Sequence, residues 1–109
     1  MKGIYIGKHY IEVPIIQGGM GVGVSLDQLA GTVSSYGALG TVSSICTGYY
    51  KNMQFIDKAV EGRPLGTENA YSTKALNEIF KNARKICGDK PLACNILHAI
   101  NDYQRVVKD

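Results

Sequence analysis

The alternation of apolar and polar residues predicts short strands at the start of the chain. Residues 4–6 and 10–12 are rich in β-prone side chains and are joined by Gly7-Lys8-His9, a pattern that indicates a small hairpin over residues 4–12. Residues 13–16, Val-Pro-Ile-Ile, form a short apolar run. Such a run is typical of a strand that is buried on both faces, so we expect one here.

Helical spacing begins after Ser25. Residues 25–28 match a capping box, in which the Ser25 and Gln28 side chains would bind the first free backbone amides of a helix. The apolar positions that follow at helical spacing are Leu26, Leu29, Ala30 and Val33. Gly37 lies where a C-terminal cap is expected. Residues 38–43 then predict a second strand, parallel to the first.

The second half of the chain predicts a helix, a strand and a last helix after a long connection. Residues 44–69 are polar and have no clear period, and a connection of this length is often functional. A long helix is predicted next, ending at Gly88, with an apolar stripe of Leu76, Ile79, Phe80, Ala83 and Ile86. Pro91 opens a third strand that runs through Ile96, and Asn101 or Asp102 would cap a last helix. We therefore expect a single α/β domain over residues 1–109, with a hairpin and about three β/α units.

Composition excludes several classes of function. The net charge is +3 with no basic run, so no nucleic-acid partner is expected. No apolar run approaches the roughly 20 residues that span a bilayer and no signal-peptide pattern is seen, which predicts a cytoplasmic protein without a membrane partner. Cys46, Cys87 and Cys94 are odd in number and lack C-x-x-C spacing, so neither a disulfide framework nor a metal site is indicated.

The densest chemical signal is the glycine loop, residues 17–25, which joins the first predicted strand to the first helix. It holds four glycines within six residues, and bare backbone of this kind can approach a flat, phosphorylated cofactor with its N–H groups. Neither the G-x-G-x-x-G dinucleotide fingerprint nor a P-loop is present. A turn that only permits tight packing of strand against helix remains the alternative.

Three segments are candidates for ligand binding because each follows a predicted strand: residues 17–23, 43–49 and 95–98. In parallel α/β proteins, ligands bind beyond the carboxyl ends of the strands. We therefore expect these segments, although far apart in the sequence, to meet at one rim.

Residues 14–25 resemble the first strand and loop of the nitronate monooxygenase (2-nitropropane dioxygenase) family, a set of FMN-dependent TIM barrels that includes the FabK-type enoyl-ACP reductases. Residues 37–41 resemble its G-G-L/I-G-x segment, and residues 94–97 its V-N-I-M segment. The match spans most of the chain in the right order. It implies FMN as cofactor and the N-terminal part of a (β/α)8 barrel, because a complete barrel needs roughly 250 residues.

The resemblance also implies a set of cofactor-binding residues. In the family, backbone at the glycine–methionine turn lies against the flavin ring and an asparagine after the third strand contacts FMN. Carried over, these positions are Gln17, Gly18, Gly19, Met20 and Asn95. From the residues alone, Met20 is also explained as core filling and Asn95 as a cap on strand-end backbone.

No catalytic residue is expected within the chain, because the catalytic histidine of the family lies on a later strand. His9 falls in the predicted hairpin, and His98 falls three residues past the family's asparagine, where the family has no catalytic histidine. Cys46 follows the second predicted strand and could face the flavin, although a free, partly buried thiol also explains it.

The resemblance implies that the parent protein oxidises a small-molecule substrate, an alkyl nitronate, with O2 to a carbonyl compound and nitrite, and that this chain alone is inactive. One alternative is a FabK-type enoyl-thioester reductase that takes electrons from NAD(P)H. Another is an inactive barrel fragment that associates with itself. Because open strand edges readily pair with another chain, a homo-oligomer is expected.

Overall fold

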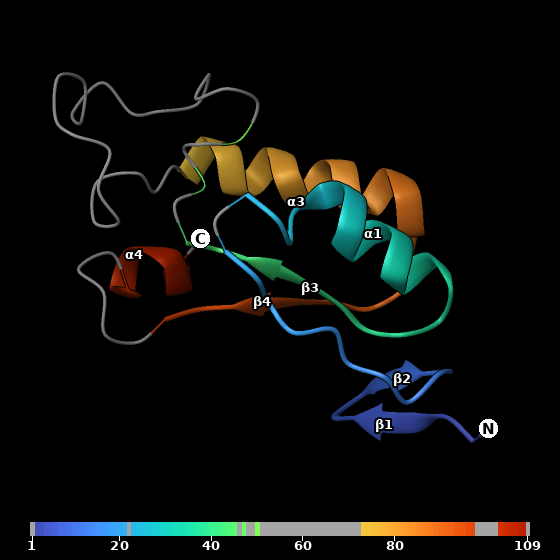
Figure 1. Cartoon of the computed structure of the whole chain (residues 1–109). Helices are drawn as coiled ribbons and strands as arrows, with labels where there is room; N and C mark the ends of the chain where they lie inside the picture. The colour runs from blue at the N-terminus through green and yellow to red at the C-terminus, as the bar shows by residue number, and fades with distance from the viewer. Residues whose placement is uncertain are drawn as a thin grey trace, which may run out of the picture.

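The computed structural model describes residues 2–21, 23–45, 47, 50, 73–97 and 103–108. The elements are β1 (Ile4–Ile6), β2 (His9–Ile11), α1 (Asp27–Ser35), β3 (Gly40–Ser43), α3 (Thr73–Cys87), β4 (Leu92–Asn95) and α4 (Tyr103–Lys108) (Figure 1). Their order confirms the predicted α/β class. Within the described residues the strands form two separate two-stranded sheets and do not close into a barrel.

The predicted N-terminal hairpin is confirmed. β1 and β2 pair antiparallel, with Ile4 opposite Ile11 and Ile6 opposite His9. Gly7 lies in the turn at a φ of 59°, a conformation that glycine adopts without steric cost. The hairpin extends away from the β3–β4 sheet, at the N-terminal end of the chain (Figure 1).

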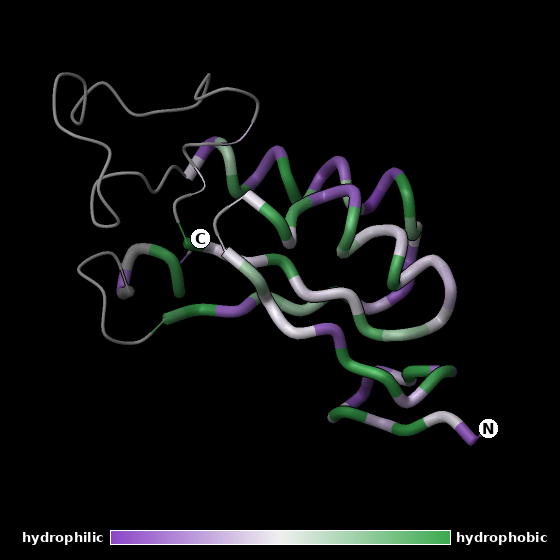
Figure 2. The backbone as a smooth tube through the Cα atoms, in the orientation of Figure 1, coloured by the Kyte–Doolittle hydropathy of each residue, from purple (hydrophilic) through white to green (hydrophobic). Residues whose placement is uncertain are grey.

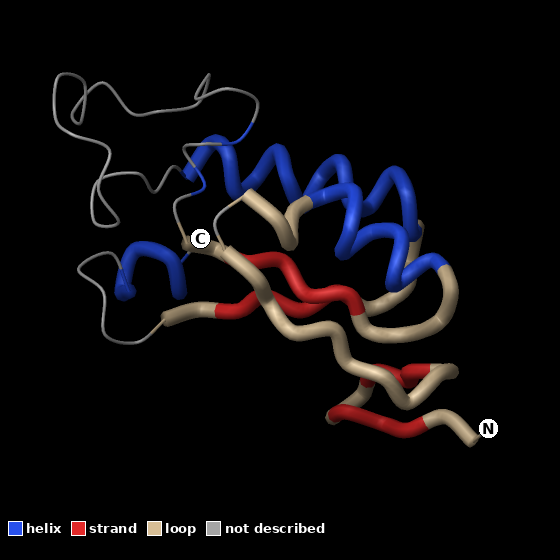
Figure 3. Tube along the Cα trace, in the orientation of Figure 1, coloured by secondary structure: helices blue, strands red, loops and turns tan. Residues whose placement is uncertain are grey.

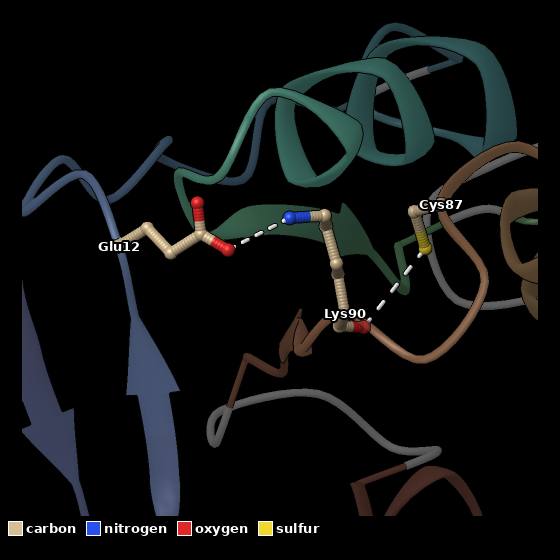
Figure 4. Close-up of polar contacts among 3 residues, drawn as sticks. All are labelled: Glu12, Cys87 and Lys90. Carbon is tan, nitrogen blue, oxygen red and sulfur yellow. Dashed lines mark hydrogen bonds and ion pairs between the residues drawn. The ribbon is translucent and has the colours of Figure 1, made fainter.

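An ion pair links the end of the hairpin to the turn between α3 and β4. Lys90 Nζ lies 3.0 Å from Glu12 Oε1 (Figure 4). The Lys90 and Glu12 side chains remain 37% and 61% exposed, so the pair contributes at most about 1 kcal/mol. The Cys87 thiol also faces the Lys90 carbonyl, at 3.9 Å.

The central sheet has the parallel pairing that the sequence predicts. β3 pairs with β4 in a register that runs from Gly40 opposite Leu92 to Ser43 opposite Asn95. On the other side of β3, Ile16 and Leu39 form a single parallel bridge. The carboxyl ends of these segments therefore lie at the same edge.

The expectation of a fully buried strand over residues 13–16 is wrong. With the described residues the segment forms that single bridge, supported by Leu39 N–H donating to the Ile15 carbonyl and Gln17 N–H donating to the Leu39 carbonyl, both at 2.9 Å. Figure 3 draws the chain that follows β2 as loop. Ile15 and Ile16 are 55% and 56% exposed, because no described element packs over their side chains.

Both long helices cover the same face of the β3–β4 sheet (Figure 1). α1 buries Asp27, Ala30, Gly31 and Ser34, whereas the sequence predicted Leu26, Leu29, Ala30 and Val33. Small residues prevail on this face because the helices approach closely: a Cβ on Gly31 would lie 3.0 Å from the Cβ of Ile86 on α3.

The predicted capping box of α1 is also wrong. Leu26 occupies the N-cap position and α1 has no side-chain cap hydrogen bond, because the Ser25 hydroxyl binds the glycine loop instead. The predicted glycine caps are confirmed. Gly37 has a φ of 95° and donates its N–H to Ser34, and Gly88 has a φ of 62° and donates to Arg84.

The core lies between the helices and β3, and it includes one residue of α4. Its buried members are Ala30, Val42, Tyr50, Ala75, Leu76, Ile79 and Val106. Figure 2 shows hydrophilic residues on the turns of α3 that lie farthest from the sheet. The apolar stripe predicted for α3 is therefore largely confirmed, although Ile86 at its end is 37% exposed.

The core contains the hydroxyl group of Tyr50. The Tyr50 hydroxyl donates to Asp27 Oδ2 at 3.0 Å and accepts from Asn82 Nδ2 at 2.7 Å, which joins α1 to α3. Burial raises the pKa of Tyr50, and the Asp27 carboxyl group acts in the same direction, while the hydrogen bond from Asn82 lowers it.

Of the described helices, none has the length and apolarity needed to cross a bilayer.

Most of the connection over residues 44–69 lies outside the described residues, as do the predicted caps Asn101 and Asp102.

Candidate functional site

The described parts of the three candidate segments meet at one rim, as predicted. Ser43 and Asn95 end β3 and β4 and lie opposite each other in the register. The glycine loop crosses both strand ends: a Cβ on Gly19 would lie 2.5 Å from the Cβ of Asn95, and one on Gly21 would overlap the Ile45 side chain. Only glycine permits this approach.

A hollow of about 250 Å³ opens at the rim. Its lining consists of Gly19, Gly21, Ser43, Ile45, Asn95 and Leu97, none of which carries a charge. The hollow is slightly smaller than the roughly 300–1,000 Å³ of typical ligand pockets. Its neutral lining of bare backbone, two apolar side chains and two hydrogen-bonding side chains fits part of a flat, uncharged ring.

Gln17 precedes the glycines of the loop, and its side-chain amide forms hydrogen bonds with other groups of the protein. Its Oε1 accepts a hydrogen bond from Thr41 N–H at 3.2 Å, and its Nε2 donates to Ser25 Oγ at 2.7 Å. Contacts from Nε2 to the carbonyl oxygens of Thr41 and Gly18 complete the set. Gln17, the first residue of the glycine loop, thus links Ser25 at the end of the loop to Thr41 of β3.

Gly18 and Met20 lie in the same loop but do not line the hollow. The space where a Gly18 Cβ would lie is open, with no atom within 4 Å. Met20 is 48% exposed, so it is not a core-filling residue. Its N–H donates to Ser25 Oγ at 2.9 Å.

Asn95 presents an exposed side chain to the hollow. Its side-chain amide forms no hydrogen bond with any residue that the structure describes, so it does not cap the backbone at the end of the strand. Its backbone is held in place by Ser44, whose Oγ and N–H donate to the Asn95 carbonyl at 2.8 and 3.2 Å. Asn95 therefore combines a fixed backbone with a side-chain amide that is available to a ligand in the hollow.

Ser43 was not singled out from the sequence, although it belongs to a candidate segment. It is 3% exposed and lines the hollow next to Asn95. The alternation of side chains along paired strands places Ser43 on the same face as Asn95, and this period-2 pattern was the available signal.

None of the described residues that line the hollow is titratable. Burial raises the pKa of the Cys94 thiol, which a hydrogen bond with Ser44 partly offsets. His9 is exposed in the hairpin, whereas His98 and Cys46 lie outside the described residues. Across the described ranges, no three or more His, Cys, Asp or Glu side chains are grouped so that they could bind a metal ion.

A search of curated proteins finds no match to the chain. The family model described as "Nitronate monooxygenase" matches residues 2–109, which includes the glycine loop and the ends of β3 and β4. The chain therefore belongs to the nitronate monooxygenase family.

Proposed function

We propose that this chain supplies the part of an FMN site that faces the isoalloxazine ring, in a protein that oxidises alkyl nitronates with O2 to a carbonyl compound and nitrite. The observation that carries the proposal is the meeting of Gly19, Ser43 and Asn95 around one uncharged hollow at the carboxyl ends of parallel strands. Membership of the family supplies the class of reaction.

The donors of the glycine loop support this assignment. The N–H groups of Gly18, Gly19 and Gly21 form no hydrogen bond with the described residues, whereas that of Met20 is bound to Ser25. Two of these free N–H groups, those of Gly19 and Gly21, belong to residues that line the hollow, and they suit the carbonyl oxygens and ring nitrogens of a flavin. Asn95 adds a carboxamide, which both donates and accepts, and Ser43 adds a hydroxyl group.

These groups indicate what the cofactor and what the residues of the chain would each contribute to the reaction. FMN, when bound, would supply the electron transfer from the nitronate to O2. The glycine loop and Asn95 would orient the ring, and the donors of the loop would favour negative charge on it. Ile45 and Leu97 would exclude water from one side of the hollow.

Titration of the purified protein with FMN, followed by flavin fluorescence, tests the assignment. Asn95→Ala should weaken binding about tenfold, the usual effect of losing one or two hydrogen bonds to a ligand. Asn77→Ala is the matched control, because Asn77 lies exposed on α3, outside the lining of the hollow. Equal affinities in the two variants would contradict a role for Asn95.

The reaction is tested separately, by O2 uptake and nitrite release with propyl-2-nitronate. Bleaching of bound flavin by NAD(P)H without nitronate turnover would favour the enoyl-thioester reductase instead. A protein that takes up no FMN would favour the inactive fragment.

A further inference from the structure

The Ser25 side chain lies at the centre of the hydrogen bonds that shape the glycine loop. It is fully buried, at 0% exposure. Its Oγ accepts from Met20 N–H at 2.9 Å and from Gln17 Nε2 at 2.7 Å, and its hydroxyl group lies 3.4 Å from the carbonyl oxygen of Gly18. A single hydroxyl group thereby contacts three points of the loop.

The backbone of Ser25 ties the same loop to the sheet. Ser25 N–H donates to the Met20 carbonyl at 2.9 Å, which closes the loop on itself. The Ser25 carbonyl accepts from Ser43 N–H at 2.8 Å, at the end of β3. The loop is therefore fixed relative to the strand that contributes Ser43 to the hollow.

We propose that Ser25 is the positioning residue of the glycine loop. By binding Met20 N–H it sets the direction of the backbone, and it leaves the N–H groups of Gly19 and Gly21, two residues that line the hollow, as donors for a ligand. That the ligand is FMN rests on the proposed function, whereas the effect on the shape of the loop does not.

A helix cap does not explain Ser25. α1 begins at Asp27, and no side chain makes a cap hydrogen bond to it. The remaining alternative is that Ser25 is only one more satisfied hydroxyl in a packed interior, which would affect stability but not the loop in particular.

Ser34 provides a matched control for that alternative. It lies on α1, is equally buried, and its Oγ also accepts from a backbone N–H and donates to a carbonyl, those of Gly40 and Pro91 at 2.9 and 2.8 Å. These contacts lie at the opposite ends of β3 and β4 from the hollow. Ser25→Ala and Ser34→Ala thus remove the same chemical group from two places.

The first measurement is hydrogen exchange of the Met20 amide in the flavin-free protein. We expect exchange at least tenfold faster in Ser25→Ala than in Ser34→Ala, once both are corrected for global stability, because only the first loses the acceptor of that N–H. Unchanged exchange at Met20 would overturn the proposal. Ser25→Cys, of nearly the same size and with a weaker acceptor, replaces Ser25→Ala if that variant does not fold.

The second measurement is the Kd for FMN. Ser25→Ala should raise it about tenfold and Ser34→Ala less than twofold. Faster exchange at Met20 with equal Kd values in the two variants would overturn the link between the loop and the ligand. If the unmodified protein binds no FMN, the proposed function fails, and the exchange rates still decide whether Ser25 positions the loop.

Discussion

The Gln17 side chain pairs with both backbone groups of Thr41, as a neighbouring strand would. Its Oε1 accepts the Thr41 N–H at 3.2 Å and its Nε2 lies 3.3 Å from the Thr41 carbonyl. This pairing continues the parallel contact that begins at Ile16 and Leu39, at the point where the backbone leaves the sheet to form the glycine loop. The Gln17 side chain thus takes the place of a neighbouring strand, so the Thr41 N–H and carbonyl groups of β3 keep hydrogen-bond partners where the backbone turns away into the glycine loop.

Gln17→Met should therefore destabilise the protein. The change keeps the length of the side chain but leaves the Thr41 backbone groups without these partners, which costs about 1–3 kcal/mol. Urea denaturation measures the loss. Gln28→Met, at an exposed position on α1, is the control and should change the free energy of unfolding by less than about 0.5 kcal/mol. Equal stabilities would show that the Thr41 groups find other partners.

Gly40→Ala should be among the most damaging small substitutions in the chain. A Cβ at this position would overlap the backbone carbonyl of Ala30, so α1 would have to move away from β3. We expect a loss at or beyond the upper end of the roughly 1–3 kcal/mol typical of overpacking. Gly18→Ala, with open space around the new methyl group, should leave stability nearly unchanged. Thermal unfolding of the two variants makes the comparison, and a stable Gly40→Ala protein would contradict the close contact of α1 with β3.

Stability should fall at alkaline pH in a way that depends on Tyr50. Because burial raises its pKa in the folded state above the ordinary value of 10.0, the unfolded chain loses the proton first. The contribution of Tyr50 is therefore complete below about pH 10 and is lost as pH rises through the raised pKa of the folded state.

Urea midpoints at pH 8 and pH 10.5 test this. The decline between the two should be smaller in Tyr50→Phe than in the unmodified protein. Tyr36→Phe, at a position that is 81% exposed, should keep the full decline. The Tyr50→Phe protein should also be less stable at pH 8, because Asp27 and Asn82 each lose a hydrogen bond. The same alkaline decline in all three proteins would rule out Tyr50 as its source.

Self-association is expected through the exposed edge at residues 13–16. Ile15 and Ile16 are both more than half exposed on a segment whose outer edge pairs with no described strand, and such an edge pairs readily with another chain. Replacing both by Lys should lower the average mass seen by light scattering, whereas Tyr36→Lys should not. A monodisperse mass near 11.8 kDa at high concentration in the unmodified protein would refute the prediction.

Local signals in the sequence determined the N-terminal hairpin, the α3 helix and the parallel order of the central strands. Each depends on residues close together in the chain: Gly7 with its positive φ, the 3.6-residue period of α3, and Gly88 after its last turn. The family motifs further identified Gly19 and Asn95, which the structure brings into contact at one hollow.

Tertiary structure decided which partner each polar side chain takes. Ser25 fits a capping box equally well on sequence, but its hydroxyl group binds Met20 and Gln17 because the loop folds back over it. The buried face of α1 is likewise set by contact with α3 and β3, which selects Gly31 and Ser34 over larger neighbours. A sequence pattern records local preference, whereas these choices depend on groups that only the folded chain brings within hydrogen-bonding or van der Waals distance.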